Sequence, residues 1–372
     1  MNNPFTMGIA TKKDFCNRKQ EITDLLTHAR NGGNVVMYSP RRYGKSSLID
    51  RVFEKLRNEG FLTVYADLFP ISSERDFVQI LSTAVIEGLG RGADPHSFIQ
   101  KIGKVFKMIV PTLEVKPDGY SFSLKFERPD DTEVTLSDLM DGIYTYVKSK
   151  RIKLSVCCDE FQEIVELPES RKIEGVLRSK IQRHKEISYF FVGSRRRILT
   201  DMFTSKSRPF YKLAHLYALK EIAESEFVKC IVSQFKRSSK QCDNETACLI
   251  YNMVRGYSYY VQKLCIIAWD LTRKRCSPDI AAKAYKHLLD TESVDFEGIW
   301  SGLTMTHRAV LKAIATEPTS SPYTREYLAQ HGLSIGGTQL AIRNLMRRDI
   351  IEKDSENNYR VTDPVFAAWM TK

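Results

Sequence analysis

The chain has 372 residues, of which 42% are hydrophobic and 27% charged, an ordinary composition for a soluble globular protein. This length predicts two or three domains, and no apolar run approaches the roughly 18 residues that a membrane-spanning helix needs. The first residues lack a basic-then-apolar signal segment. The eight cysteines form no C-x-x-C pair and histidine is scarce, which argues against a zinc site or a disulfide framework. This cysteine usage predicts a reducing cytoplasm. We expect no membrane partner, because no long apolar run is present.

The net charge of +11 is concentrated in residues 171–240, which hold 17 lysines and arginines and 6 acidic residues. The rest of the chain is therefore close to neutral. A basic block of this size is typical of proteins that meet phosphates, from a nucleotide or a nucleic acid. It also fits a solvated helical surface with a few site arginines, and the sequence leaves both readings open.

Residues 34–48 organise the rest of the chain. An apolar segment (34–38) runs into the sequence Ser39-Pro40-Arg41-Arg42-Tyr43-Gly44-Lys45-Ser46-Ser47. It follows the phosphate-binding pattern G-x-x-x-x-G-K-[ST], with Ser39 in place of the first glycine. Loop N–H groups and a helix N-terminus bind anions. Lys45 would reach the β- and γ-phosphates of a nucleotide, the Ser46 hydroxyl would bind Mg²⁺, and Gly44 would allow close backbone approach. We expect Arg41 and Arg42 to form salt bridges or to face a partner, although they lie within the cofactor-binding loop.

The first 220 residues predict an α/β domain with a parallel sheet, because strands alternate with helices. The expected strands are 34–38, 61–68, 152–158, 187–192 and 214–219. Residues 11–30 are expected to form a short approach and a helix, and the other expected helices are 46–58, 74–90, 95–108, 134–149 and 171–185. Alternation on both sides of Pro117-Asp118-Gly119 predicts a hairpin insertion at about 110–130, either an edge decoration or a partner contact.

After residue 220 the pattern becomes helical. Helices at about 223–238, 243–254, 257–274 and 278–291 predict an α-helical lid, residues 221–295. Residues 296–372 then read as three helices followed by a hairpin around 354–358, which is the order of a winged-helix domain.

Candidate catalytic residues follow two of the predicted strands. Asp159 and Glu160 end one strand, and ligand sites in doubly wound sheets lie at the carboxyl ends of strands. Asp159 would support Mg²⁺, and Glu160 would polarise the attacking water. Ser194, at the end of the next strand, either bonds the water or the γ-phosphate or is a simple turn residue. Arg208 is a candidate arginine finger, in cis or from a neighbouring subunit of a homo-oligomer, or an ordinary surface arginine.

Several segments together resemble the archaeal and bacterial P-loop ATPases of the AAA+/STAND group, including origin-recognition-like proteins. The segments are Phe15-x-x-Arg18-x-x-Glu21, the loop 39–46, Cys158-Asp159-Glu160-Phe161, Gly193-Ser194 and the ending Asp363-Pro364-Val365-Phe366-x-x-Trp369. The stretch Gly256–Gln262 resembles the Gly-x-Pro…Gln lid motif of the group, with Ser258 where proline is expected. The resemblance implies an AAA+-like core, a helical lid and a C-terminal winged helix. It also implies that Phe15 and Arg18 lie near the adenine and that Gln262 closes over ATP or ADP.

Three functions remain open from the sequence. One is an ATPase whose bound nucleotide switches the lid and the winged helix. Another is an ATP-regulated protein that binds duplex DNA, of the origin-recognition or transposition-helper type, with Arg195, Arg196, Arg343, Arg347 and Arg348 as candidate contacts. Residues 300–372 hold 9 basic and 7 acidic residues, a weak charge for a DNA reader, so a protein effector is the other candidate partner. The last is a signalling scaffold that binds nucleotide without hydrolysing it.

Overall fold

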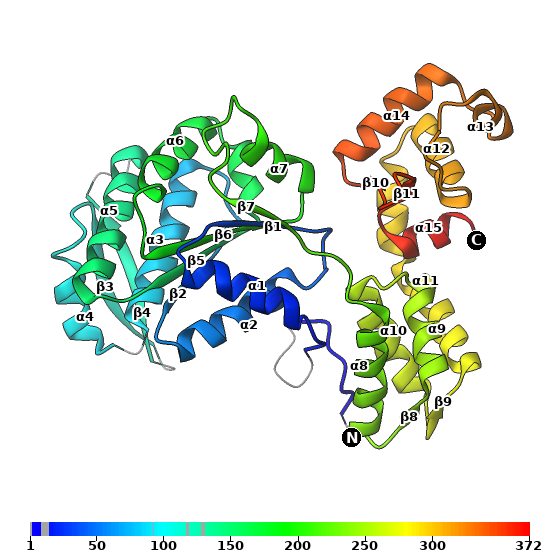
Figure 1. The fold of residues 1–372 in the computed structure, drawn as a ribbon, viewed down its shortest axis with the longest axis horizontal. Helices are drawn as coiled ribbons and strands as arrows, with labels where there is room; N and C mark the ends of the chain where they lie inside the picture. The colour runs from blue at the N-terminus through cyan, green and yellow to red at the C-terminus, as the bar shows by residue number, and fades with distance from the viewer. Residues whose placement is uncertain (1, 9–14, 92, 117–118, 128–130) are drawn as a thin grey trace. The chain divides into compact units, whose positions relative to one another are not determined.

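The computed structural model describes residues 2–8, 15–91, 93–116, 119–127 and 131–372 (Figure 1). The chain forms two compact units. One, here called the α/β unit, comprises Arg18–Arg41 and Lys45–Leu219. The other, the helical unit, comprises Met1–Asn17, Arg42–Gly44 and Lys220–Lys372. Within the described residues, no helix combines the length and the apolar character that crossing a bilayer requires.

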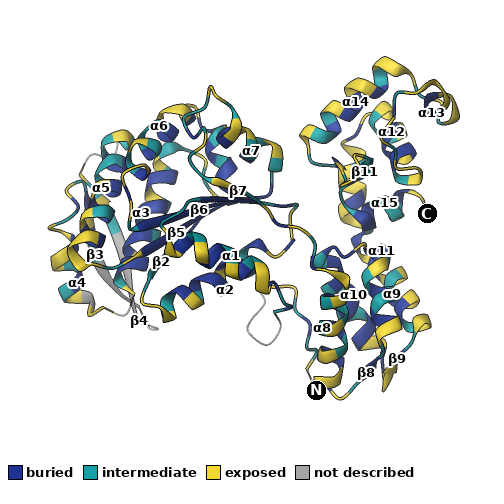
Figure 2. Ribbon diagram, in the orientation of Figure 1, coloured by how far each residue is buried: buried dark blue, intermediate teal, exposed yellow. Residues whose placement is uncertain are grey.

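The α/β unit is built on a five-stranded parallel sheet in the order β2-β5-β6-β1-β7, which confirms the predicted parallel sheet. The strands are β1 (Val35–Tyr38), β2 (Leu62–Asp67), β5 (Leu154–Asp159), β6 (Ile187–Gly193) and β7 (His215–Ala218). β5 and β6 are buried at every position, as expected of parallel strands covered on both faces (Figure 2). In the register Tyr38 pairs with Gly193 and Asp67 with Asp159, so the carboxyl ends of neighbouring strands are aligned.

Helices cover both faces of this sheet (Figure 1). One face carries α1 (Lys19–Arg30) and α2 (Lys45–Asn58); the other carries α3 (Glu74–Gly90), α5 (Thr132–Lys150), α6 (Ser170–Ile181) and α7 (Arg196–Thr204). Successive residues of β6 serve the two layers, because strand side chains alternate between faces. Phe190 packs against Phe53 of α2, and Phe191 packs against Phe161 and Phe203.

The first helix lies within the expected segment 11–30, and the insertion is present. α1 begins at Lys19, because Asn17 and Arg18 have left-handed backbone conformations (φ 48° and 74°) that a helix cannot contain. Residues 11–14 of the expected approach lie outside the described residues. β3 (Ile109–Lys116) and β4 (Gly119–Phe126) form the predicted antiparallel hairpin, whose Pro117 and Asp118 also lie outside them. It follows α4 (Pro95–Ile102), which ends earlier than the predicted 108.

The helical unit joins the expected lid and the winged helix around one hydrophobic core. Its lid part contains α8 (Glu224–Arg237), β8 (Gln241–Cys242), α9 (Asn244–Met253), α10 (Ser258–Leu271), β9 (Arg275–Cys276) and α11 (Pro278–Ser301). The winged-helix part contains α12 (Met305–Thr316), α13 (Arg325–Gln330), α14 (Ile335–Arg347), β10 (Ile351–Lys353), β11 (Tyr359–Val361) and α15 (Pro364–Met370). α11 runs through the boundary expected at 295/296, so a single helix serves both parts.

The C-terminal Asp-Pro-Val-Phe-x-x-Trp ending attaches the winged helix to the lid. Asp363 caps α15: its Oδ1 accepts hydrogen bonds from the backbone N–H groups of Val365 and Phe366, both at 2.9 Å. Its Oδ2 accepts a hydrogen bond of 2.6 Å from the Tyr260 hydroxyl of α10. Trp369 Nε1 donates to Ser293 Oγ of α11 at 3.1 Å. The motif therefore has a structural role in this fold.

The sequence argues against a disulfide framework, and the structure contains one disulfide bond among the described residues. Cys16 of the N-terminal segment and Cys230 of α8 form a disulfide bond across a sequence separation of 214 residues. Cysteine spacing reveals local patterns such as C-x-x-C, and a pair this distant is brought together only by the tertiary fold. The other cysteines, at 157, 158, 242, 248, 265 and 276, are free thiols.

A buried ion pair holds α6 to the loop after α7. Arg208 donates to Glu174 Oε1 at 2.5 Å, and the two side chains are 13% and 0% exposed. Within the part of the chain that the structure describes, Glu174 Oε2 and Arg208 Nε have no hydrogen-bond partner. Burial raises the pKa of Glu174 to about 7, although the neighbouring Arg208 lowers it. The guanidinium is thus the main group that keeps this buried carboxylate charged.

We predict that Arg208→Met destabilises the α/β unit in a pH-dependent way. Losing one partner of a buried pair costs about 3–5 kcal/mol, because the other charge is left uncompensated. Without Arg208 the pKa of Glu174 in the folded chain rises further above the unfolded value of 4.5. Between these two pKa values the folded chain binds a proton that the unfolded chain releases. The loss in the free energy of unfolding is therefore largest at pH 8 and becomes smaller toward pH 5.

Urea unfolding at pH 8 and at pH 5, followed by circular dichroism, measures this effect. Arg195→Met is the matched control, because Arg195 is 39% exposed and pairs with Glu166 at the surface. A surface pair contributes at most about 1 kcal/mol. An equal loss for Arg208→Met at both pH values would contradict the prediction.

Candidate functional site

The loop after β1 has the backbone that a phosphate cradle requires. Arg42 and Gly44 have positive φ values of 63° and 83°, which turn the chain sharply before α2. Among the described residues, no atom lies within 4 Å of the position that a Cβ would take on Gly44. Glycine is therefore favoured there by the left-handed backbone conformation and not by a lack of space. Ser39 is 1% exposed and is not in the left-handed region, so serine can replace the first glycine of the pattern without strain.

Lys45, the first residue of α2, turns back over this loop. Its side chain is buried, and Nζ donates to the carbonyl oxygens of Pro40 (3.2 Å) and Ser39 (3.5 Å). Burial lowers the pKa of Lys45, while the nearby carboxylates of Glu160 and Asp159 raise it. An ammonium held only by neutral carbonyls can exchange these bonds for charge-assisted bonds to phosphate oxygens, which are roughly twice as strong.

Asp159, the last residue of β5, lies beside the start of α2. Ser46 Oγ donates to Asp159 Oδ2 at 2.9 Å, so a hydroxyl oxygen and a carboxylate oxygen lie side by side. The Tyr65 hydroxyl of β2 donates to the same Oδ2. Sequence reasoning missed Tyr65. The available signal was the period of two in a strand, since Tyr65 pairs with Cys157 and therefore shares a sheet face with Asp159.

Glu160 faces the end of β6. Its Oε2 accepts hydrogen bonds from Ser194 Oγ (2.9 Å), the Ser194 N–H (3.3 Å) and Gln162 Nε2 (2.5 Å). The structure thus brings together Glu160 and Ser194, which the sequence placed at the ends of two strands without predicting this contact. It adds Gln162, which the sequence analysis did not single out. A Cβ on Gly193 would lie 1.9 Å from Gln162 Oε1, so glycine is needed at 193 for the Gln162 side chain to fit.

These residues suit a nucleotide with a bound Mg²⁺. The Ser46 hydroxyl and the Asp159 carboxylate are hard oxygen donors of the kind that Mg²⁺ prefers. Among the described residues, no group of three or more His, Cys, Asp or Glu side chains could hold a metal by itself. A cation at Ser46 and Asp159 would therefore need further oxygens, which phosphates and water provide.

The tip of the loop, Arg42–Gly44, belongs to the helical unit. The Arg42 guanidinium stacks over the Tyr259 ring of the same chain at 4.3 Å, and the expected salt bridge or partner contact stays a prediction. Tyr43 is buried, with its ring 4.7 Å from that of Tyr257 and its hydroxyl 3.2 Å from Glu221 Oε1. Arg41 is exposed and Ser47 is half-buried.

The residues expected around the base of a nucleotide have structural contacts in this state. Arg18 is buried and pairs with Glu21 at 2.9 Å where α1 begins. Phe15 is half-buried in the N-terminal segment. Gln262 donates from Nε2 to Cys16 Sγ at 3.9 Å. Their roles toward a nucleotide stay predictions.

Part of the basic block 171–240 is paired inside the fold. The pairs include Lys172 with Glu133 (3.1 Å), Lys180 with Asp141 (2.5 Å), Arg195 with Glu166 (2.9 Å) and Arg208 with Glu174 (2.5 Å). Arg196 opens α7 and is half-buried. By contrast, Arg343, Arg347 and Arg348 are exposed on α14 and directly after it. The structure thus pairs some of the block with local acids, while Arg171, Arg183 and Lys185 of the block are exposed, as are the arginines of α14.

Comparison with known proteins identifies the fold. Residues 294–372 match the family model described as "Probable winged helix domain", and no curated protein matches the chain. The Walker-type ATPase PABY2304 of Pyrococcus abyssi is similar over 98% of both chains, with a TM-score of 0.67 and 17% identity. The ORC2 protein of Aeropyrum pernix, solved as ADPNP–ADP complexes, is similar over 95% of this chain and 93% of its own, with a TM-score of 0.56 and 15% identity. The chain therefore has the AAA+-like fold of the Walker-type P-loop ATPases and ends in a winged-helix domain.

Proposed function

We propose that the chain binds ATP and is a magnesium-dependent ATPase whose nucleotide state acts as a switch on the winged helix. The hydrogen bond between Ser46 Oγ and Asp159 Oδ2, 2.9 Å long, supports this most directly. It joins the helix that opens behind the phosphate loop to the acidic end of a buried strand. Both oxygens are what a phosphate-bound Mg²⁺ needs from the protein.

Each polar residue of the site has a role in this proposal. Lys45 binds the β- and γ-phosphates, and Ser46 and Asp159 hold the Mg²⁺, which neutralises developing charge on the phosphates. Glu160 takes the proton of the attacking water. Ser194 and Gln162 hold the Glu160 carboxylate in position through their hydrogen bonds to Oε2. Arg208 is outside this set, because its guanidinium is paired with Glu174.

A chain of contacts in the helical unit supports the coupling. Tyr43, within the P-loop sequence, bonds Glu221 Oε1, which also accepts a hydrogen bond of 3.4 Å from Arg360 of β11. Arg360 also pairs with Glu352 of β10 at 2.8 Å. The same helical unit therefore contains both the tip of the phosphate loop and the wing hairpin. A change in the loop conformation on nucleotide binding would alter the first contact of this chain.

We predict that Glu160→Gln binds ATP with unchanged affinity but releases phosphate at least about 100-fold more slowly, because loss of a general base costs about 10²–10⁴-fold. Fluorescent ATP titration and a phosphate-release assay measure the two effects. Glu166→Gln is the control, since Glu166 is 63% exposed and pairs with Arg195 at the surface. Unchanged turnover in Glu160→Gln would refute the base assignment. Wild-type protein that binds ATP without releasing phosphate would instead favour the non-hydrolysing scaffold.

We predict that Tyr65→Phe raises the Mg²⁺ concentration needed for half-maximal ATPase activity by about tenfold. Its hydroxyl orients Asp159, and removal of such an outer-shell partner typically costs about 10–100-fold in metal affinity or activity. Binding of ATP without Mg²⁺ should not change. Mg²⁺ titrations of wild type and variant test this, with Tyr38→Phe of β1, a strand that does not pair with β2, as the tyrosine control. An identical Mg²⁺ dependence would exclude Tyr65 from the metal site.

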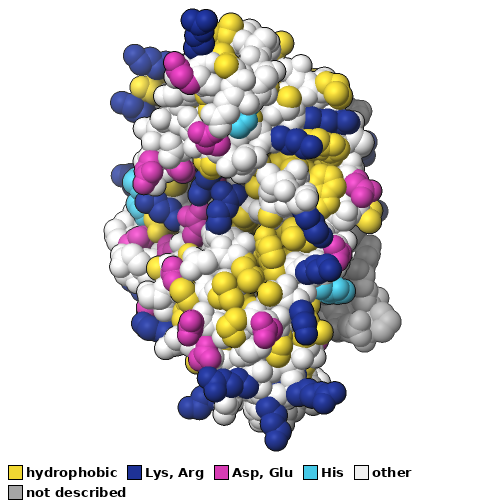
Figure 3. Space-filling view, turned by 90° about the vertical axis from the view of Figure 1, so that its right-hand side faces the viewer, with side chains coloured by type: hydrophobic (Ala, Val, Ile, Leu, Met, Phe, Trp, Pro, Cys, Tyr) yellow, Lys and Arg dark blue, Asp and Glu magenta, His cyan; other side chains and the backbone are white. Residues whose placement is uncertain are grey.

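Duplex DNA binding is a second candidate function, which the exposed face of α14 favours. Gln339, Arg343 and Arg347 are exposed on this helix, which corresponds to the recognition helix of a helix-turn-helix. Ile335 and Leu340 on the same helix are each 57% exposed, which fits a protein partner better. On the face shown in Figure 3, lysines and arginines are dispersed among apolar and acidic side chains and form no continuous basic surface.

If α14 binds DNA, Arg343→Ala with Arg347→Ala should weaken binding at every sequence tested. It should also reduce the slope of log affinity against log salt by about 0.9 for each lost phosphate contact. Fluorescence anisotropy with a labelled duplex between low and moderate salt measures this, with Arg325→Ala of α13 as the control. Absence of binding by the wild type at low salt, with and without ATP, would remove the DNA hypothesis and leave a protein effector.

A further inference from the structure

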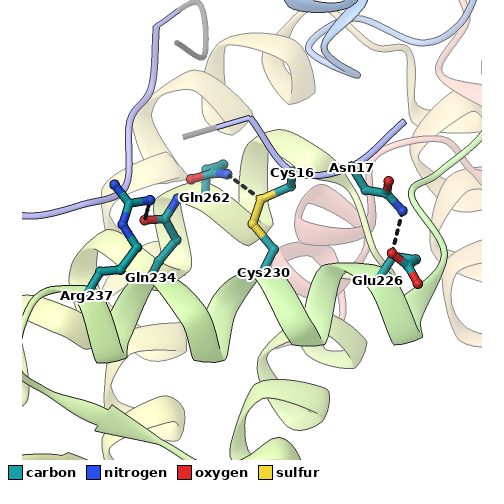
Figure 4. The surroundings of a disulfide bond; sticks show 7 residues. All are labelled: Cys16, Asn17, Glu226, Cys230, Gln234, Arg237 and Gln262. Carbon is teal, nitrogen blue, oxygen red and sulfur yellow. Dashed lines mark hydrogen bonds between the residues drawn. A yellow bond between two sulfur atoms is a disulfide. The ribbon is translucent and has the colours of Figure 1, made fainter. Parts of the chain in front are cut away.

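The Cys16–Cys230 disulfide lies outside the proposed ATPase chemistry and has a distinctive place in the chain. Figure 4 shows Cys16 on the N-terminal segment, which runs beside α8, the helix that carries Cys230. Cys16 lies two residues before Arg18, where the chain enters the α/β unit, and α8 is the first helix after Leu219, where the chain leaves it. The bond therefore joins the two chain segments that flank the α/β unit.

Other contacts hold the same segment to the helical unit. Asn17 Nδ2 donates to Glu226 Oε2 at 2.5 Å, one turn before Cys230 on α8 (Figure 4). The Phe5 ring packs against Phe235 of α8 at 5.4 Å, and Asn3 Nδ2 donates to the Ile266 carbonyl at 3.2 Å. These contacts do not depend on the bond. The two sulfurs would therefore stay close after reduction, so that the bond can form again.

The disulfide also contacts a residue of the expected lid motif. Gln262 Nε2 donates to Cys16 Sγ at 3.9 Å (Figure 4). Within the described part of the chain, the buried Gln262 Oε1 has no hydrogen-bond partner. Gln262 is the residue that the sequence resemblance places over the nucleotide. The Cys16 sulfur therefore lies next to a candidate nucleotide contact.

We propose that Cys16 and Cys230 form a reversible latch, which when oxidised restricts movement between the α/β unit and the helical unit and slows the release of bound nucleotide. When the bond is closed, the chain segment that leads into the α/β unit is covalently attached to α8, the first helix after the chain leaves that unit. With the bond open, the entry segment is held by non-covalent contacts alone and can detach transiently. The part concerning nucleotide release rests on the proposed ATP binding.

Thiol–disulfide exchange with a dithiol reductant of the thioredoxin type opens the latch. A thiolate of the reductant attacks Sγ of Cys230, which is the more accessible cysteine because Cys16 is only 7% exposed. The S–S bond breaks, and Cys16 leaves as a thiolate and takes up a proton. The second thiolate of the reductant then attacks the mixed disulfide and releases Cys230. Two electrons and two protons pass from the dithiol to the latch, and glutathione disulfide takes them back when the latch closes.

The experiment uses the full chain, oxidised with glutathione disulfide or reduced with dithiothreitol, and loaded with fluorescent ADP. We expect the dissociation rate of ADP to be about fivefold or more lower in the oxidised protein. Cys230→Ser should release ADP at the fast rate under both conditions. Cys248→Ser, which removes a free thiol of α9, should respond to oxidation as the wild type does. Comparison of the oxidised and reduced wild type needs no substitution and so does not depend on how a variant folds.

Peptide mapping without reductant and small-angle X-ray scattering separate the outcomes. Absence of a peptide pair linking Cys16 and Cys230 in the oxidised protein overturns the proposal, as do equal ADP release rates in a protein that carries the link. If neither form binds nucleotide, the proposed function fails and scattering alone judges the latch. A distance distribution that is broader for the reduced wild type and for Cys230→Ser than for the oxidised wild type then supports the latch. Identical distributions for all three overturn it.

Discussion

The alignment of strand ends in one parallel sheet is the constraint on which the candidate site depends. β1, β5 and β6 end at the same edge, so that the phosphate loop, the Asp159-Glu160 pair and Ser194 follow each other in space although more than a hundred residues separate the first from the others. The Ser46–Asp159 hydrogen bond then closes the contact between the loop helix and β5. A slip in register would separate these side chains, because side chains alternate between faces along a strand.

The helical unit shows how a winged helix can be an integral part of a larger body. α11 crosses from the lid into the winged helix, and the Asp363 cap bonds a lid tyrosine while Trp369 bonds a lid serine. These contacts bury side chains of both parts in one core. Any displacement of the lid would therefore be transmitted to the wing through packed side chains, and no flexible linker would absorb it. This favours a switch in which the winged helix reports the state of the nucleotide site.

Part of the positive charge of this protein is paired within the fold. Arg208, which the sequence offers as a catalytic finger, neutralises a buried glutamate, and several lysines of the basic block pair with nearby acids. Because the Arg208–Glu174 pair is buried, breaking it would lower the stability of the fold strongly, whereas the exposed pairs contribute little to stability. Net charge by itself therefore overstates the surface that is free for a nucleic acid. Several basic residues stay exposed, among them Arg171, Arg183 and Lys185 of the block and the arginines of α14, which share their helix with exposed apolar side chains.

The sequence alone determined the fold class, the phosphate loop, the acidic pair and the winged helix, because each depends on local patterns: strand and helix periods, a turn before a helix N-terminus, and the order of elements. Only the tertiary structure showed that Tyr65 bonds Asp159, that Gln162 positions Glu160, and that Arg208 pairs with Glu174. The Cys16–Cys230 bond belongs with these, since its partners are 214 residues apart. The physical reason is the same in each case. Strand register and helix packing determine such contacts, and they leave no pattern among residues that are neighbours in the sequence.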